Sequence, residues 1–266
     1  MIAYEKRLLT YLDILGFSDL IDESLKGDPK VVDKIARILQ IFSTAFTDGG
    51  RMTIGENNNP KELSNFYNFS DLMLRAMLIK PMDDPMVFLD FEVYNLAHRQ
   101  LLMLIEEQVI IRGAITLDYA VCENNLVFGP AVIQAYLLER DVAIFPRIIV
   151  DIRLFEQYAK ARPGAKISSH YMKLGEDGVP FIDYLLSVFF DMYRGHTNSS
   201  SFPQRILEQH KAVILKKLEE LDGKDMKRKA KVWWLWMYHN KTIELIQERL
   251  GDDMPMKGAV GACKII

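Results

Sequence analysis

The sequence predicts an α+β fold, with a mainly antiparallel sheet in the first part of the chain and a helical extension at the C-terminal end. Strand-like apolar runs meet at two short turns, Ser70-Asp71 and Glu123-Asn124-Asn125, as in hairpins. Helical periods separate these hairpins, and beyond about residue 152 helical periods dominate. We therefore expect a sheet-containing domain over residues 1–155 and a mainly helical extension over 156–266, packed on it.

Turn and loop residues separate the expected helices and strands. In order, we expect a strand near 7–14, a short helix from 18, a helix over 30–46, a polar loop over 47–61, a hairpin over 64–79, a helix over 90–107 and a strand over 109–117. A hairpin over 119–128, a helix over 129–139, a strand over 143–150, a loop over 199–203 and helices over 205–221 and 226–250 complete the pattern. Pro130 suits the first position of its helix.

Composition excludes several classes of protein. The 266 residues are 49% hydrophobic, enough for a substantial core, and the net charge of −3 predicts no general affinity for nucleic acid or anionic membranes. Cys122 and Cys263 lie far apart, without zinc-ligand spacing or a disulfide pattern, as in a reducing cytosol. We expect a cytoplasmic protein with no signal peptide, because charges at 5–7 interrupt the start, and with no membrane insertion.

Asp13 is the first candidate functional residue. It follows an apolar run over 8–12 and precedes Gly16 and Ser18-Asp19, so it lies where a strand turns into a helix. A lone carboxylate at the end of a buried strand is costly to desolvate unless it has a partner. The backbone N–H groups of Leu15–Ser18 point from a helix N-terminus, a position that suits phosphate. Carboxylate and phosphate cradle together predict a site for a metal and a nucleotide.

Asp71 is the second candidate, at the tip of the expected 64–79 hairpin. If this hairpin packs beside the first strand, Asp13 and Asp71 come together, and two close carboxylates repel unless a cation lies between them. Two aspartates with few other protein ligands suit Mg²⁺, which keeps waters and takes substrate phosphates. An alternative remains open, in which Asp13 pairs with a core arginine such as Arg112 or Arg147.

These residues resemble a known family. The segment YLDILGFS at 11–18 and the hairpin Asp71 resemble the metal-binding residues of class III nucleotidyl cyclases, and segments 110–116, 125–131 and 135–139 look like that family's central strand, hairpin and following helix. The resemblance covers about residues 5–155. It implies a ferredoxin-like, palm-type cyclase domain with two Mg²⁺ or Mn²⁺ ions held by Asp13, Asp71 and the Ile14 carbonyl. The helical extension is similar to the bacterial Pycsar pyrimidine cyclases of antiphage signalling.

The chain departs from the family's pattern in the half of the site that reads the base. The family's helix Asn and Arg fall at Ile133 and Leu137, and its purine-selecting residues fall at Tyr67 and Pro130. We therefore assign base contact to Tyr67 and Pro130 and favour a pyrimidine nucleotide. The family's strand arginine falls at Ile111, whereas this chain has Arg112, and a shift of one residue moves a side chain to the other face of a strand.

Three functions are consistent with the residues. The first is a cyclase that converts a nucleoside triphosphate into a 3′,5′-cyclic monophosphate and pyrophosphate, with Asp13 and Asp71 as catalytic residues. The second is another palm-type nucleotidyltransferase. The third is a degenerate cyclase that acts as a nucleotide sensor or scaffold, favoured by Ile133 and Leu137. The resemblance implies a homodimer. The aromatic run 232–238 and the basic run 227–231 are expected to be core or interface and a solvated helix start, respectively.

Overall fold

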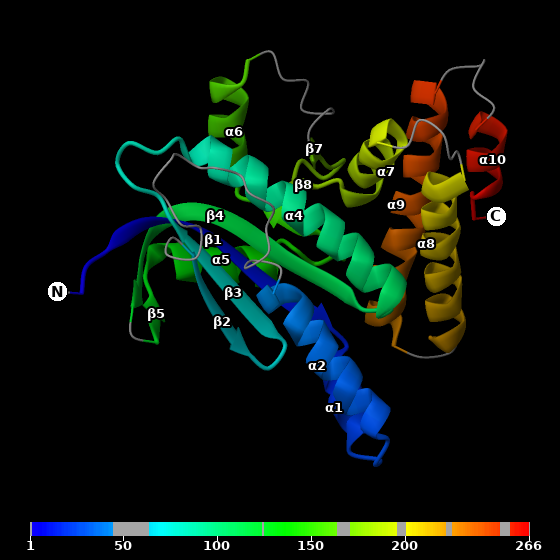
Figure 1. Ribbon diagram of the computed structural model, residues 1–266, viewed down its shortest axis with the longest axis horizontal. Helices are drawn as coiled ribbons and strands as arrows, with labels where there is room; N and C mark the ends of the chain where they lie inside the picture. The colour runs from blue at the N-terminus through cyan, green and yellow to red at the C-terminus, as the bar shows by residue number, and fades with distance from the viewer. Residues whose placement is uncertain are drawn as a thin grey trace.

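The computed structural model is a mixed α+β protein with a mainly antiparallel eight-stranded sheet, which confirms the predicted fold class (Figure 1). It describes residues 2–44, 64–123, 125–163, 171–195, 201–221, 225–250 and 256–265. The expected loop over 47–61 lies outside these residues.

The bounds of the elements are as follows. The strands are β1 (Glu5–Leu15), β2 (Ser64–Phe69), β3 (Leu72–Leu78), β4 (Ile110–Glu123), β5 (Leu126–Phe128), β6 (Ile148–Val150), β7 (Met172–Leu174) and β8 (Pro180–Ile182). The helices are α1 (Phe17–Ser24), α2 (Pro29–Thr44), α4 (Pro85–Glu106), α5 (Pro130–Asp141), α6 (Ile152–Ala161), α7 (Tyr184–Gly195), α8 (Ser201–Glu220), α9 (Met226–Leu250) and α10 (Met256–Ala262).

Strand β1 organises the sheet, because it pairs on both of its sides. The strand order is β2-β3-β1-β4-β6-β8-β7, with β5 added to β4. Both neighbours of β1 run antiparallel to it, and β4 pairs with β6 in parallel. Gly113 of β4 lies opposite Leu12, and a Cβ there would come within 2.3 Å of the Tyr11 carbonyl oxygen. Glycine therefore permits the close approach of β1 and β4.

The two faces of the sheet bury different helices. Alternate residues of a strand point to opposite faces. Leu8, Leu12 and Ile14 of β1 belong to the large core beneath α4, and Leu9 belongs to a smaller cluster with Ala131 and Ala135 of α5. Helix α4 therefore crosses one face of the central strands and α5 covers the other, which carries Asp13 (Figure 1).

A buried ion pair attaches α4 to the sheet. Arg75 of β3 donates to Glu92 of α4 over 2.7 Å, and the Thr10 hydroxyl donates to the other carboxylate oxygen over 2.5 Å. The Glu92 side chain is fully buried, so these bonds replace the water that the carboxylate loses on folding.

The C-terminal helices pack around a second polar chain. The Tyr184 hydroxyl contacts His210 Nε2 at 2.8 Å, the Nδ1 atoms of His210 and His239 lie 3.0 Å apart, and His239 Nε2 lies 2.9 Å from the Cys263 carbonyl oxygen. A carbonyl only accepts, so His239 Nε2 donates, His210 Nδ1 donates to His239 and Tyr184 donates to His210. Both imidazoles are therefore neutral, and the chain joins α7, α8, α9 and the end of α10.

The structure corrects several expected elements. The helix expected over 90–107 begins at Pro85, where the Asp84 side chain accepts from Met86 N. The strand expected over 143–150 is reduced to β6, which begins after Pro146. The C-terminal part also contributes strands β7 and β8 to the sheet, because the Asp177-Gly178 turn forms a short hairpin that the helical periods on both sides obscured.

Other differences concern the helices. Residue 155, the expected domain boundary, lies inside α6, and one hydrophobic core runs from Leu8 of β1 to Cys263 near the C-terminus. Residues 201–203, expected in a loop, open α8, where Pro203 is tolerated in the first turn. Among the described helices, none is both long enough and apolar enough to cross a membrane.

The paired histidines predict acid sensitivity. Burial lowers the pKa of His239 to about 4, and burial followed by repulsion from His239 lowers the pKa of His210. In the unfolded chain both have a pKa near 6.5. The unfolded state therefore binds protons that the folded state does not, so the stability present above about pH 6.5 is lost as the pH falls towards 4. His239 alone should cost about 2 kcal/mol by pH 5.

Urea unfolding at pH 7 and pH 5 measures this loss. His239→Gln should have a smaller difference between the two pH values than the parent protein, because it removes one titrating group. His98→Gln is the matched control, since His98 is partly exposed and lies outside the chain of Tyr184, His210 and His239. An unchanged pH dependence in His239→Gln would contradict the neutral pair.

Candidate functional site

Asp13 lies near the C-terminal end of β1, on the face of the sheet that α5 covers. It is paired in register with Leu72 of β3 on one side and with Arg112 of β4 on the other. Its side chain is one-fifth exposed. The central position of β1 thus places this carboxylate between two strands, with access to solvent.

Arg112 lies between two carboxylates. Its Nε donates to Asp13 Oδ2 over 2.8 Å, its Nη2 lies 2.6 Å from Glu139 Oε1 of α5, and its Nη1 donates to the Ala143 carbonyl over 3.4 Å. The structure therefore shows the arginine pairing that the sequence left open for Asp13, with Arg112. Ile111 points into the core on the opposite face, as expected from the one-residue shift.

Glu139 is nearly buried, and opposing electrostatic effects act on the pKa of its carboxyl group. Desolvation raises the pKa of Glu139, Arg112 opposes this rise, and Asp13 and Asp71 add to it. Two acids therefore share one guanidinium, so the site has excess negative charge that a further cation would relieve.

The hairpin of β2 and β3 brings Asp71 next to Asp13. The backbone N–H of Ile14 donates to the Asp71 carbonyl over 3.3 Å, and Ser70 at the tip has a φ of 59°. Tyr11 lies close to all three acids. Desolvation, followed by repulsion from Glu139, Asp13 and Asp71, raises the pKa of Tyr11 to about 12. The strand β1, the hairpin and α5 thus each place one acidic residue near Tyr11.

The proposed phosphate cradle follows Asp13 directly. Gly16 has a φ of 81°, a left-handed conformation, and is the N-cap of α1. Phe17 is buried and anchors the helix, Ser18 is exposed, and Leu15 and Gly16 line a cleft. The chain therefore turns here as expected, although phosphate contact by Leu15–Ser18 stays a prediction.

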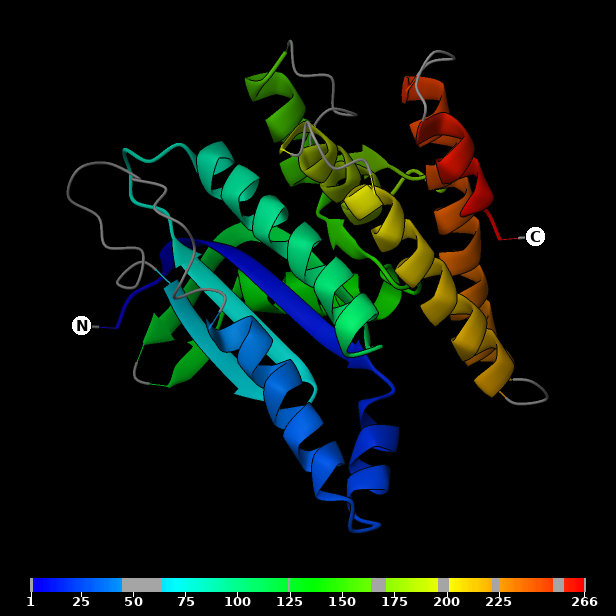
Figure 2. The same ribbon diagram turned by 45° about the vertical axis from the view of Figure 1, so that its right-hand side comes forward.

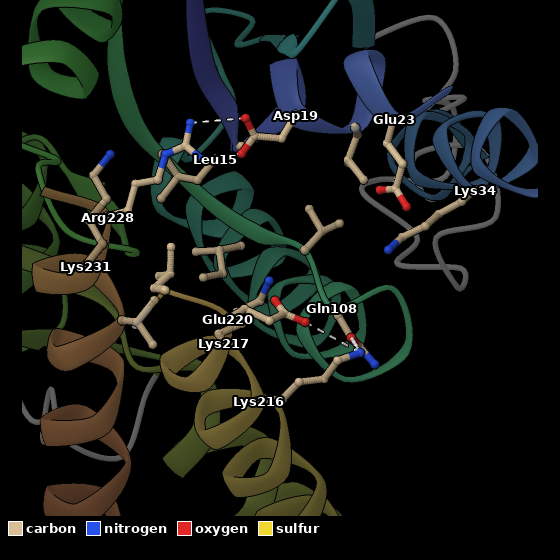
Figure 3. A pocket seen from close by; sticks show the side chains of 16 residues that line it. Leu15, Asp19, Glu23, Lys34, Gln108, Lys216, Lys217, Glu220, Arg228 and Lys231 are labelled. Atoms are coloured by element: carbon tan, nitrogen blue, oxygen red, sulfur yellow. Dashed lines mark hydrogen bonds and ion pairs between the residues drawn. The ribbon is translucent and has the colours of Figure 1, made fainter. Parts of the chain in front are cut away.

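This cleft has a volume of about 450 Å³ and lies between the start of α1, the start of β4 and the helices α8 and α9 (Figure 3). Lys231 of α9 lines it and connects it with the carboxylates. Desolvation lowers the pKa of Lys231, Arg112 lowers it further, and Asp13 and Glu139 oppose the shift. The cleft and the acidic site are therefore neighbours.

The positions assigned to the base lie on the same face of the sheet. Tyr67 of β2 is half-buried and packs against the same small cluster as Tyr11, with Leu74 of β3 between them in register, and desolvation raises the pKa of Tyr67. Pro130 is exposed at the first position of α5. Ile133 and Leu137, on the outer side of α5, are 60% and 37% exposed.

Sequence reasoning missed two functional candidates. Glu139 follows Ala131 and Ala135 at intervals of four on the sheet-facing side of α5, and this spacing could have identified it as a buried acid. Lys231 belongs to a basic run that was expected to be a solvated helix start, but it faces the cleft instead. No sequence pattern indicates that α9 lies beside α1, where Arg228 pairs with Asp19.

The donor set bears on the expected metal ions. Among the described residues, no group of three or more His, Cys, Asp or Glu side chains is arranged to hold a metal ion. Asp13 and Asp71 lie on neighbouring segments, and Mg²⁺ needs only one or two carboxylates when substrate phosphates supply the rest, so binding by Asp13, Asp71 and the Ile14 carbonyl stays a prediction. The residues fit an ion that arrives with a nucleotide.

Comparisons with known proteins are sparse. No protein-family profile matches the chain, and neither does any curated protein. Among solved structures, the adenylyl cyclase CyaB from P. aeruginosa is similar at 15% identity and a TM-score of 0.44, over 60% of this chain and 83% of that one. This likeness is too distant to identify the fold family or the activity.

Removing the central guanidinium should destabilise the protein in a pH-dependent way. Arg112→Gln leaves Asp13 and Glu139 without their cation, and we expect a loss of about 3 kcal/mol in unfolding free energy at pH 7. The pKa of Glu139 would rise further above its unfolded value. A carboxyl group with a raised folded pKa gives less stability as pH rises, so the variant should recover part of the loss at pH 5.

Urea unfolding of the parent and the variant at both pH values checks this expectation. Arg140→Gln is the matched control, because Arg140 is half-exposed and pairs with Asp141 at the surface, where ion pairs contribute about 1 kcal/mol or less. An equal loss at pH 5 and pH 7 would contradict a shared guanidinium.

Proposed function

We propose that the protein is a nucleotidyl cyclase that converts a nucleoside triphosphate into a 3′,5′-cyclic nucleotide and pyrophosphate. The observation that carries the proposal is that the Ile14 N–H donates to the Asp71 carbonyl, which brings the hairpin tip next to Asp13 and the Gly16 turn. Two carboxylates at the edge of a sheet, next to a helix N-terminus, are suited to binding a metal ion together with a triphosphate.

The order of elements supports a palm-type core. Strands β4, β1, β3 and β2 lie side by side, and α1 and α2 join β1 to β2 while α4 joins β3 to β4. This connection supports the split βαβ unit and ferredoxin-like arrangement that the sequence resemblance implies. In it, the end of β1 and the β2–β3 hairpin meet at one edge, where the two aspartates lie.

The reaction requires the ribose 3′-oxygen to form a bond to the α-phosphorus while the bond to the bridging oxygen of pyrophosphate breaks. The hydroxyl proton is released to water. Asp13, Asp71 and the Ile14 carbonyl would hold two Mg²⁺ or Mn²⁺ ions, which when bound lower the pKa of the hydroxyl and stabilise the leaving pyrophosphate. Leu15–Ser18 would cradle phosphates, and the ion pair with Arg112 holds Asp13 in place.

Substitution of either aspartate tests the assignment. Asp13→Asn and Asp71→Asn should each reduce turnover by at least about a hundredfold, because each removes a metal ligand. Thermal unfolding should show that both variants stay folded. Turnover is followed by mass spectrometry with all four ribonucleoside triphosphates and Mg²⁺ or Mn²⁺. Asp22→Asn, an exposed aspartate on α1, is the matched control. Full activity in either site variant would exclude the assignment, and an oligonucleotide product would favour another palm-type transferase.

The base-facing residues favour a pyrimidine. Tyr67 offers a ring and one hydroxyl, and Pro130 offers no side-chain polar group, so neither replaces the purine contacts of the family. Discrimination depends on polar groups that the wrong base leaves unpaired. We expect UTP or CTP to be cyclised faster than ATP and GTP, measured as relative turnover. Tyr67→Ala should reduce this preference, and faster turnover of a purine by the parent protein would contradict it.

A nucleotide sensor is the second candidate. Arg112 already pairs with Asp13, and Ile133 and Leu137 replace the polar residues that the family uses on this helix. A sensor would bind a triphosphate without releasing a cyclic product. The same mass spectrometry, combined with calorimetric binding of each triphosphate, separates the two candidates.

We further propose a homodimer that uses the outer side of α5. Ile133, Tyr136 and Leu137 are exposed there, together with Tyr119 and Phe128 of the adjoining strands. Ile133→Asp should shift the protein towards monomer in light-scattering measurements, because it buries a charge at the interface. Ile152→Asp, at a comparably exposed isoleucine on α6, should not. A parent protein that is monomeric and fully active would exclude the dimer.

A cyclic nucleotide is a diffusible product, so a role in signalling follows from the proposed activity. We propose antiphage signalling on the sequence resemblance to the Pycsar cyclases. Plaque assays on cells that express the parent protein or Asp13→Asn test this role, since protection should require the intact aspartate.

A further inference from the structure

Cationic side chains dominate the cleft beside the Gly16 turn, and most of them come from the C-terminal helices (Figure 3). The cations are Lys34 of α2, Lys216 and Lys217 of α8, and Arg228 and Lys231 of α9. The carboxylates in the lining are Asp19, Glu23 and Glu220. The lining therefore has an excess of positive charge in a protein whose overall net charge is −3.

Only part of this positive charge is compensated. Arg228 forms an ion pair with Asp19, and Lys216 lies 2.7 Å from Gln108 Oε1 and 3.9 Å from Glu220. For Lys34, Lys217 and Lys231, the described part of the chain offers no carboxylate within 4 Å. In Figure 3, Lys34 and Lys231 approach the cleft from opposite walls.

Lys217 is the least favourably placed of these lysines. Desolvation lowers the pKa of Lys217, and Lys34 and Lys216 lower it further while Glu220 opposes them. A partly buried ammonium group among like charges costs free energy in the absence of an anion. Such an arrangement is expected where a bound anion supplies the missing partner.

The N-terminal part of helix α9 also has positive side chains in an unfavourable place. Its first turn contains no acidic residue, although Asp225 caps the Lys227 N–H, and Arg228 and Lys231 follow. Cations near a helix N-terminus oppose the helix dipole, which favours anions there. The N-terminal ends of α1 and α9 both border the cleft, so the backbone and the side chains favour the same sign of ligand.

We propose that this cleft binds a polyphosphate chain, and that α8 and α9 thereby supply the cations for the substrate's phosphates from within the same subunit. Lys217 and Lys231 are the principal ligands, with Lys34 on the opposite wall. The cleft volume of about 450 Å³ is within the ordinary range for small-molecule sites, about 300–1000 Å³. Lys231 lines the cleft and interacts electrostatically with Asp13, so a chain bound here would lie next to the carboxylates. The identity of the ligand as a nucleotide rests on the proposed function, but the binding of polyphosphate does not.

Calorimetry with inorganic tripolyphosphate on the full-length protein, without divalent metal, tests the proposal. Lys217→Gln and Lys231→Gln should each weaken binding by about tenfold or more, because charge-assisted hydrogen bonds are lost. Lys227→Gln is the matched control, since Lys227 is an exposed lysine of the same helix outside the cleft. The melting temperature of Lys217→Gln should be unchanged or higher, because the substitution removes repulsion.

The outcomes separate this site from the catalytic proposal. A double variant Asp13→Asn, Asp71→Asn should still bind tripolyphosphate in the absence of metal, whether or not the parent protein is a cyclase. Uridine monophosphate should bind more weakly than tripolyphosphate. Parent affinity in both lysine variants, or no binding of tripolyphosphate by the parent protein, would overturn the proposal even if cyclase activity is found.

Discussion

The ion pairs of Arg112 with Asp13 and Glu139 are the interaction on which the candidate site depends. They join β1, β4 and α5, and Arg112 opposes the rise that burial causes in the pKa of Glu139. Their geometry follows from the antiparallel register that sets Asp13 opposite Arg112. A slip of one residue would send either side chain to the opposite face and leave the other without a partner.

The single positive charge of Arg112 does not balance the two acids that it contacts, and Asp71 adds a third acidic residue nearby. The hairpin lies beside β1 because the core under α4 requires β3 to pair with it, and the same pairing puts Asp71 near Ile14. The fold therefore concentrates negative charge at the site and positive charge in the adjoining cleft. In a metal–polyphosphate group, the positive metal would lie at the acidic site and the negative phosphates in the cationic cleft. The proposed function and the proposed polyphosphate site therefore fit together.

The C-terminal helices belong to this arrangement. Their core is continuous with that of the sheet, and Figures 1 and 2 both show α8 and α9 side by side along its edge. The buried chain through His210 and His239 fixes α8 against α9, so the walls that carry Lys217 and Lys231 have a defined separation.

The sequence by itself determined the α+β class, the two hairpins, the turn at Gly16 and the candidates Asp13 and Asp71, because alternation, turn residues and a charge in an apolar run are local signals. Sequence also offered Arg112 as a possible partner of Asp13 but could not choose it over Arg147. Only the tertiary structure decided that choice, together with the burial of Glu139 and the position of Lys231 beside the site. Strand register and the docking of α9 bring together residues about 100 to 200 positions apart, and these contacts depend on packing that no local pattern encodes.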